Sequence, residues 1–231
     1  AYKTFNEFFT RPLKAGARPI VSGDNILTCP ADGTVSESGA IHDDQIFQAK
    51  NHNYTVKELV GGNEALAALF KDGRFATVYL APYNYHRMHM PIDGLLRKMV
   101  HVPGRLFSVA QWTVRNIPRL FARNERLICL FSTDAGPIVM VLVGAINVAA
   151  IETVWSGLVT PPRGKRITDF DYADTKKTYQ KGEEMGRFNM GSTVILLTPP
   201  NVEWLSKFRA GQVVRVGEAI GSFTKKERTL V

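Results

Sequence analysis

The chain has 231 residues, of which 45% are hydrophobic and 22% are charged. This composition argues against a disordered protein, and the length suffices for one substantial core, so we expect a single domain over residues 1–231. With 29 basic and 21 acidic residues the net charge is +8, which favours nucleic acid or an anionic lipid surface as a partner. The basic residues are dispersed and match no nucleic-acid-binding motif, so we expect no nucleic-acid partner.

Three short helices are predicted from their N-terminal caps. One begins at Thr4, in a Thr-x-x-Glu capping box, and ends near Pro12. A second capping box begins at Thr55 and its helix ends at a Gly-Gly pair. Asn63 caps a third helix over residues 64–70.

Most of the remaining chain reads as β-strand, because branched and aromatic residues dominate it. The predicted strands are residues 75–80, 94–102, 126–132, 138–145, 147–155, 193–197 and 212–216. Residues 133–136 resemble a hairpin turn, and residues 169–181 are polar enough for an exposed loop. Strands without regular intervening helices predict a mainly β (α+β) fold, with an antiparallel β-sandwich or barrel-like core and a few peripheral short helices.

The two cysteines and the most apolar segment also predict buried structure. Cys29 and Cys129 lie far apart in apolar contexts, so we expect two buried, reduced thiols rather than a disulfide. Residues 138–151 are too few for a bilayer span and are interrupted by Gly and Asn, which favours two buried strands. The chain begins at Ala1 rather than Met, and we expect that a preceding segment has been removed.

The tripeptide Gly191-Ser192-Thr193 opens a β-type run. Taken alone, it favours an ordinary turn that starts a strand. The chemical alternative is that the Ser192 hydroxyl attacks the carbonyl of Gly191 and converts the peptide bond into an ester. Elimination would then cut the chain and leave a pyruvoyl group, whose ketone can bind an amine and accept electrons.

Four further blocks stand around this tripeptide and decide between the two interpretations. They are residues 8–20, Pro30-Ala31-Asp32-Gly33, Tyr85-His86-Arg87-Met88-His89-Met90-Pro91, and residues 143–145 with 151–153. In this order, and over nearly the whole chain, they resemble the bacterial-type phosphatidylserine decarboxylases. One tripeptide is weak evidence, whereas the ordered set is specific. Met190 stands where the family more often has Leu or Phe, a substitution that conserves apolar volume.

The resemblance implies a role for each of four residues. Cleavage between Gly191 and Ser192 would give a large subunit, residues 1–191, and a small subunit, residues 192–231. His89 would take the Ser192 proton, and Asp32 would orient His89 and stabilise its charged form. His86 would serve the decarboxylation step by positioning substrate or handling a proton. Without the resemblance, Asp32 reads as a turn residue and His89 as a packed histidine.

The resemblance also implies the cofactor and the partners. The cofactor would be the covalent pyruvoyl group made from Ser192, and we expect no metal, because no third ligand stands near His86 and His89. The substrate would be phosphatidylserine in an anionic membrane. Bacterial relatives suggest a homodimer that is peripheral on the cytoplasmic face of the cell membrane.

Residues 105–121 are the first choice for a surface that faces the membrane. Aromatic and basic side chains alternate loosely there, as suits a lipid headgroup region. The candidates are Phe107, Trp112, Arg115, Arg119 and Phe121. An equally good interpretation is a loop that covers the core and has a solvated basic edge.

Two other classes of function stay open on the residues alone. Ser192, His89 and Asp32 could form the triad of a hydrolase that acts on an external ester, although the Gly-x-Ser-x-Gly elbow is missing. The chain could also be a non-catalytic β domain that binds anionic lipid. Within pyruvoyl chemistry, the ordered blocks disfavour a soluble amino-acid decarboxylase.

Overall fold

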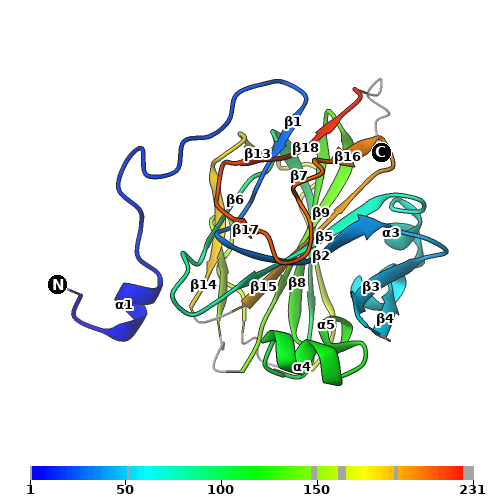
Figure 1. Ribbon diagram of the computed structural model, residues 1–231, viewed down its shortest axis with the longest axis horizontal. Coiled ribbons are helices and arrows are strands. Elements are labelled where there is room, and N and C mark those ends of the chain that lie inside the picture. The colour runs from blue at the N-terminus through cyan, green and yellow to red at the C-terminus, as the bar shows by residue number, and fades with distance from the viewer. Residues whose placement is uncertain (1, 51, 147–149, 161–164, 190–191, 226–231) are drawn as a thin grey trace.

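The computed structural model describes residues 2–50, 52–146, 150–160, 165–189 and 192–225. These residues form mainly antiparallel sheets with short helices at the periphery (Figure 1), which confirms the predicted fold class. The strands of the described segments do not close into a barrel.

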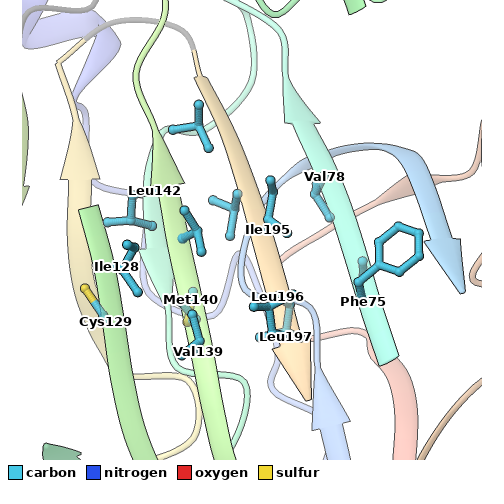
Figure 2. Packing of buried hydrophobic residues seen from close by; sticks show 14 of the residues in the cluster. Phe75, Val78, Ile128, Cys129, Val139, Met140, Leu142, Ile195, Leu196 and Leu197 are labelled. Atoms are coloured by element: carbon cyan, nitrogen blue, oxygen red, sulfur yellow. The ribbon is translucent and has the colours of Figure 1, made fainter. Parts of the chain in front are cut away.

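The largest sheet has nine strands and carries the centre of the core. In spatial order it contains β12 (Thr168–Asp171), β7 (Gly94–Val102), β8 (Arg126–Thr133), β9 (Gly136–Val143), β15 (Ser192–Thr198), β5 (Arg74–Leu80), β2 (Gly33–Ala40) and β17 (Val213–Val214), with β13 (Thr178–Tyr179) also paired to β7. Figure 2 shows the packed side chains of β5, β8, β9 and β15. Their branched and apolar residues are buried on both faces of these strands, which suits near-continuous apolar runs.

Three smaller sheets complete the β structure. The first has three strands, β1 (Ile26–Thr28), β18 (Ala219–Phe223) and β16 (Val202–Trp204). The second has four strands, β11 (Gly157–Leu158), β10 (Ile151–Thr153), β14 (Glu184–Phe188) and β6 (Arg87–His89). The third is the pair β3 (Gln45–Ala49) and β4 (His52–Thr55). The four-stranded sheet holds both histidines of the Tyr-His-x-x-His block at or beside β6.

The helices are short, and three of them begin at the predicted caps. They are α1 (Phe5–Phe9), α2 (Val56–Leu59), α3 (Glu64–Ala68), α4 (Gln111–Asn116) and α5 (Leu120–Arg123). Thr4, Thr55 and Asn63 each accept a backbone N–H at a helix start, as predicted. The sequence did not predict α4 and α5, which lack side-chain caps.

Several other expectations are tested by the fold. Cys29 and Cys129 are buried and unbonded, as predicted, and burial raises the pKa of both thiols. The hairpin turn at residues 133–136 joins β8 to β9. The predicted loop at residues 169–181 is wrong in part, because β12 and β13 pair with β7 and form the edge of the main sheet. Polar residues suit such an edge, whose outer side faces water.

Some expected features lie outside the described residues. Residues 147–149 of the predicted strand 147–155 are among them, and so is Gly191. For Ser192 only the backbone is described. The single-domain organisation and the two subunits stay predictions.

Candidate active site

Ser192 begins the central strand β15, at one end of the main sheet. Its backbone pairs with Leu80, the last residue of β5. Thr193 pairs with Val143, the last residue of β9, and Val143 in turn pairs with Arg126 at the start of β8. We call this edge the Ser192 end of the main sheet. The catalytic blocks are expected to converge here.

The Pro-Ala-Asp-Gly and Tyr-His-x-x-His blocks lie side by side. The backbone N–H of His89 donates to the carbonyl of Pro30 at 2.9 Å. On the other side of β6, the N–H of Phe188 donates to the carbonyl of His86 at 3.0 Å. Strand β14 therefore runs beside the histidines, and the chain continues from it to Asn189, two residues before Gly191.

Gly33 explains why the Pro-Ala-Asp-Gly block needs its glycine. A Cβ at this position would stand 2.3 Å from the carbonyl oxygen of Tyr79 on the neighbouring strand β5. Such a contact is impossible, so only glycine lets the backbone approach this closely. Gly33 thus begins strand β2, and Asp32 lies directly before the strand.

Asp32 is buried and is held by two distant parts of the chain. The Nε atom of Arg18 donates to both carboxylate oxygens, at 3.0 and 3.1 Å, and its Nη2 also contacts the carboxylate. The backbone N–H of Val216 donates to Oδ1 at 2.9 Å. The hydrogen bond to Asp32 raises the pKa of Arg18. Asp32 therefore connects the N-terminal segment that contains Arg18 with the C-terminal segment that contains Val216.

His89 has a partner for each ring nitrogen, and neither partner is Asp32. Nδ1 lies 2.7 Å from the carbonyl oxygen of Gly182, and Nε2 lies 3.0 Å from the hydroxyl of Tyr85. A carbonyl only accepts, so Nδ1 carries the hydrogen of the neutral ring and Nε2 holds the free electron pair. Burial lowers the pKa of His89, while the hydrogen bond to Gly182 and the negative charges of Glu184 and, last, Asp32 act in the opposite direction.

The expected role of Asp32 is therefore only partly matched. Its charge favours the protonated form of His89, but the carboxylate does not contact the ring, because Arg18 and Val216 occupy it. Gly182 orients the imidazole instead. Sequence reasoning missed Gly182 and Arg18. The latter lies inside a quoted family block, so its position was a usable signal.

His86 is fully buried and has one nitrogen without a partner. Nδ1 lies 2.9 Å from the carbonyl oxygen of Asn84, and the ring stacks on Phe9 with centroids 3.8 Å apart. Burial lowers its pKa to about 4, so the ring is neutral at pH 7. No hydrogen bond to Nε2 is found among the described residues. A buried acceptor without a partner is costly and suggests a missing polar group.

Thr193 adds a second such atom beside Ser192. Its side chain is buried, and its Oγ1 has no hydrogen-bond partner within the described segments. A backbone interaction with Leu80, the residue opposite Ser192, acts to raise the pKa of His86. Of the two polar atoms, one therefore belongs to the residue after Ser192, and the other to a histidine that interacts with the strand partner of Ser192.

Glu152 anchors the strand that leads to the processing site. Its carboxylate accepts from Nε of Arg187 at 2.6 Å and from Nδ2 of Asn189 at 3.1 Å. The N–H of Asn189 donates to the carbonyl of Ala150 at 3.0 Å. The block of residues 143–145 and 151–153, to which Glu152 belongs, therefore positions the chain two residues before Gly191.

The residues proposed to face a membrane separate into exposed and buried ones. Trp112 is 77% exposed, and Arg115 and Arg119 are exposed, with Arg119 paired to Glu58. Phe107 is partly buried beneath the guanidinium of Arg123. For Phe121 the prediction is wrong, because helix α5 turns this side chain into the core, where it is 1% exposed.

The described residues contain neither a metal cluster nor a membrane-spanning helix. No group of three or more His, Cys, Asp or Glu side chains that could hold a metal ion occurs there. In the same residues, no helix has the length and apolar character needed to cross a membrane.

Comparison with known proteins gives one consistent result. Residues 5–222 match the family model described as phosphatidylserine decarboxylase. The chain is similar to the phosphatidylserine decarboxylase proenzyme of Alkalilimnicola ehrlichii, with 61% identity over 198 residues, 85% of this chain and 69% of that protein. Identity to the proenzyme of Yersinia enterocolitica is 54% over 95% of this chain and 77% of the relative. Identity to the proenzyme of Vibrio parahaemolyticus is 55% over 94% of this chain and 77% of the relative.

Proposed function

The chain belongs to the phosphatidylserine decarboxylase family, and we propose that it converts phosphatidylserine into phosphatidylethanolamine after cutting itself between Gly191 and Ser192. The observation that carries the proposal is the position of Ser192. It begins the central strand of the main sheet, opposite Leu80, which interacts with His86, and the next residue pairs with Val143 of another family block.

Self-cleavage would use side chains whose protonation states follow from their surroundings. His89 is neutral with its electron pair on Nε2, so it can take the hydroxyl proton of Ser192. The Ser192 oxygen then attacks the Gly191 carbonyl, and the peptide bond becomes an ester. Elimination releases Gly191 as a carboxylate and leaves dehydroalanine at residue 192, and one water converts this residue into pyruvoyl with loss of ammonia.

The surroundings of Ser192 fit the pyruvoyl group. Thr193 Oγ1 can donate to a carbonyl or carboxylate oxygen, and His86 Nε2 can accept a hydrogen. Both atoms are buried and lack partners in the described residues, as expected where a polar group is still to form. When present, the pyruvoyl ketone supplies an electron sink for loss of carbon dioxide from the serine headgroup.

The two products of the cut should stay together. Strand β15 lies between β5 and β9 in the main sheet, and β18 pairs with β1. The Val216–Asp32 hydrogen bond adds a buried polar link between the two pieces. Residues 1–191 and 192–231 would therefore form one stable heterodimeric unit. We further propose that this unit forms homodimers and works on the cytoplasmic face of a bacterial membrane.

An intact mass spectrum of the denatured protein tests this function. We expect two species that meet at the Gly191-Ser192 bond, with a combined mass that has gained one water and lost one ammonia. Ser192→Ala should give one uncut species without decarboxylase activity. Normal cutting in that variant would disprove the mechanism. An uncut wild-type chain that a fluorophosphonate labels at Ser192 would favour the hydrolase alternative instead.

A further inference from the structure

A second feature of the Ser192 end is an open hollow lined by three cationic side chains. It has a volume of about 540 Å³ and is bordered by Pro103, Gly104, Arg105, Arg123 and Lys165. No ion pair involves any of these three cations in the part of the chain that the structure describes. Unneutralised cations around a concave surface concentrate anions.

Backbone hydrogen bonds connect the two segments that border this hollow. The N–H of Arg105 donates to the carbonyl of Arg123 at 2.8 Å, and the N–H of Glu125 donates to the carbonyl of Arg105 at the same distance. A Cβ on Gly104 would stand 2.5 Å from the carbonyl oxygen of Arg123, so only glycine permits this close packing. The guanidinium of Arg123 lies over the ring of Phe107, 4.8 Å from its centroid. These contacts therefore fix the backbone that carries Arg105 and Arg123.

One short segment carries both the cationic hollow and an apolar groove, because Arg105 borders the hollow and Val109 lines the groove. This groove has a volume of about 380 Å³, and its lining also includes Phe5, Leu80 and Ile146. Leu106 and Trp112 are also exposed, and Trp112 belongs to α4 at the lower end of the molecule in Figure 1. Cationic and apolar surfaces on one short segment match a membrane interface better than a soluble anion.

The backbone that borders the hollow is also connected by hydrogen bonds to the strands of the candidate site. Asn124 is buried, and its Nδ2 donates to the carbonyls of Phe107 and Gly144 at 2.8 and 2.9 Å. Gly144 follows Val143, the partner of Thr193 in the main sheet. A bilayer held at this hollow would therefore lie at the Ser192 end, and not at the opposite end of the sheet.

We propose that this hollow binds the phosphate of an anionic phospholipid headgroup, at a site separate from the one that holds the substrate. Arg105, Arg123 and Lys165 contact the phosphate, while Leu106 and Trp112 enter the interfacial layer beside it. Such a site seats the protein on anionic membranes even when the lipid is not a substrate. It is independent of pyruvoyl chemistry, so the two proposals can fail separately.

Vesicle flotation tests the site with phosphatidylglycerol, an anionic lipid without a serine headgroup, in a phosphatidylcholine background. The variant is Arg105→Gln/Arg123→Gln/Lys165→Gln. The matched control is Lys71→Gln/Lys207→Gln/Arg209→Gln, which removes the same charge from exposed positions. These positions lie away from Ser192, which pairs with the last residue of β5. Lys71 precedes the start of β5. Lys207 and Arg209 flank Phe208, whose carbonyl accepts a hydrogen bond from Ser38, and Ser38 pairs with Ala76 near the start of β5.

We expect binding of the hollow variant to fall by at least about tenfold relative to the control, because each cation near an anionic surface contributes independently. Equal weakening in both variants would mean that only net charge attracts the protein, and would overturn the proposal. Self-cleavage is the separate readout for folding and maturation. If the triple variant does not fold, Arg105→Gln/Lys165→Gln decides by the same criterion.

Two further arms identify the ligand. Arg105→Lys/Arg123→Lys keeps the charge and should keep at least half of the vesicle binding. Inorganic phosphate, added at constant ionic strength, should leave binding of the wild-type protein unchanged, because it lacks the apolar contacts of a lipid in a bilayer. Release of the wild-type protein by inorganic phosphate would make the hollow a soluble-phosphate site and would contradict the lipid proposal.

Discussion

The hydroxyl of Tyr85 lies 3.0 Å from Nε2 of His89. Because burial raises the pKa of Tyr85 to about 12, its phenol is protonated at pH 7 and donates to this nitrogen. The electron pair that should accept the proton of Ser192 is thus already occupied. The phenol must either withdraw before self-cleavage or pass the proton along.

Replacing Tyr85 with Phe distinguishes these two possibilities. We expect Tyr85→Phe to cut itself as fast as the wild-type chain or up to about fivefold faster, because a competing hydrogen bond of about 1 kcal/mol is removed. The measurement is the time course of the two fragments by denaturing mass spectrometry. His89→Ala is the reference and should remain mostly uncut. A tenfold loss in Tyr85→Phe would instead place the phenol in the proton path.

The rate of self-cleavage should depend on pH through His89. The ring acts as a base only when unprotonated, and burial lowers its pKa below the usual value of about 6.5. The rate should therefore rise with pH through this lowered pKa and be constant at neutral pH. A rate that still increases above about pH 7.5 would contradict His89 as the base.

Asp32→Asn should move this pH profile in a defined direction. The carboxylate of Asp32 raises the pKa of His89, so its removal lowers that pKa further. The midpoint of the profile should shift to lower pH, and the rate on the plateau should fall, because the imidazolium is less stabilised. Asn keeps an acceptor for Val216, which limits structural damage. An unchanged or raised midpoint would show that the charge of Asp32 does not act on His89.

His86→Ala should separate maturation from turnover. The neutral ring with its unpartnered Nε2 is expected to act on the substrate and not on the Gly191-Ser192 bond. Cutting should go to completion, while decarboxylation in detergent micelles falls by roughly 100-fold. His42→Ala, at an exposed position, is the control. Failure of His86→Ala to cut would assign this histidine to maturation.

Gly33→Ala should destabilise the fold by at least about 2 kcal/mol, because its Cβ would meet the backbone of Tyr79 at 2.3 Å. Gly39→Ala is a matched control in the same strand, where the nearest atom to the new Cβ would be 3.5 Å away. Thermal unfolding of both, in the uncut Ser192→Ala background, gives the comparison. Similar unfolding temperatures for the two variants would refute the close approach of β2 and β5.

Local signals in the sequence predicted much of this fold. The caps at Thr4, Thr55 and Asn63 depend on contacts within three residues, so they can be recognised without knowing the fold. The apolar runs of β8 and β9 indicate buried strands in the same way. The family blocks identified Asp32, His86, His89 and Ser192, but not the contacts that these residues make.

By itself, then, the sequence determined the β class and the capped helices, and it indicated the residues proposed to carry the chemistry. Only the tertiary structure decided the partners: Gly182 for His89, which is 93 residues away, and Val216 for Asp32, which is 184 residues away. It also decided that Phe121 faces the core and that β12 and β13 extend a sheet edge. Contacts between residues so distant along the chain depend on how the sheets pack against one another. Side-chain types and local periodicity predict single strands and helices, but not that packing.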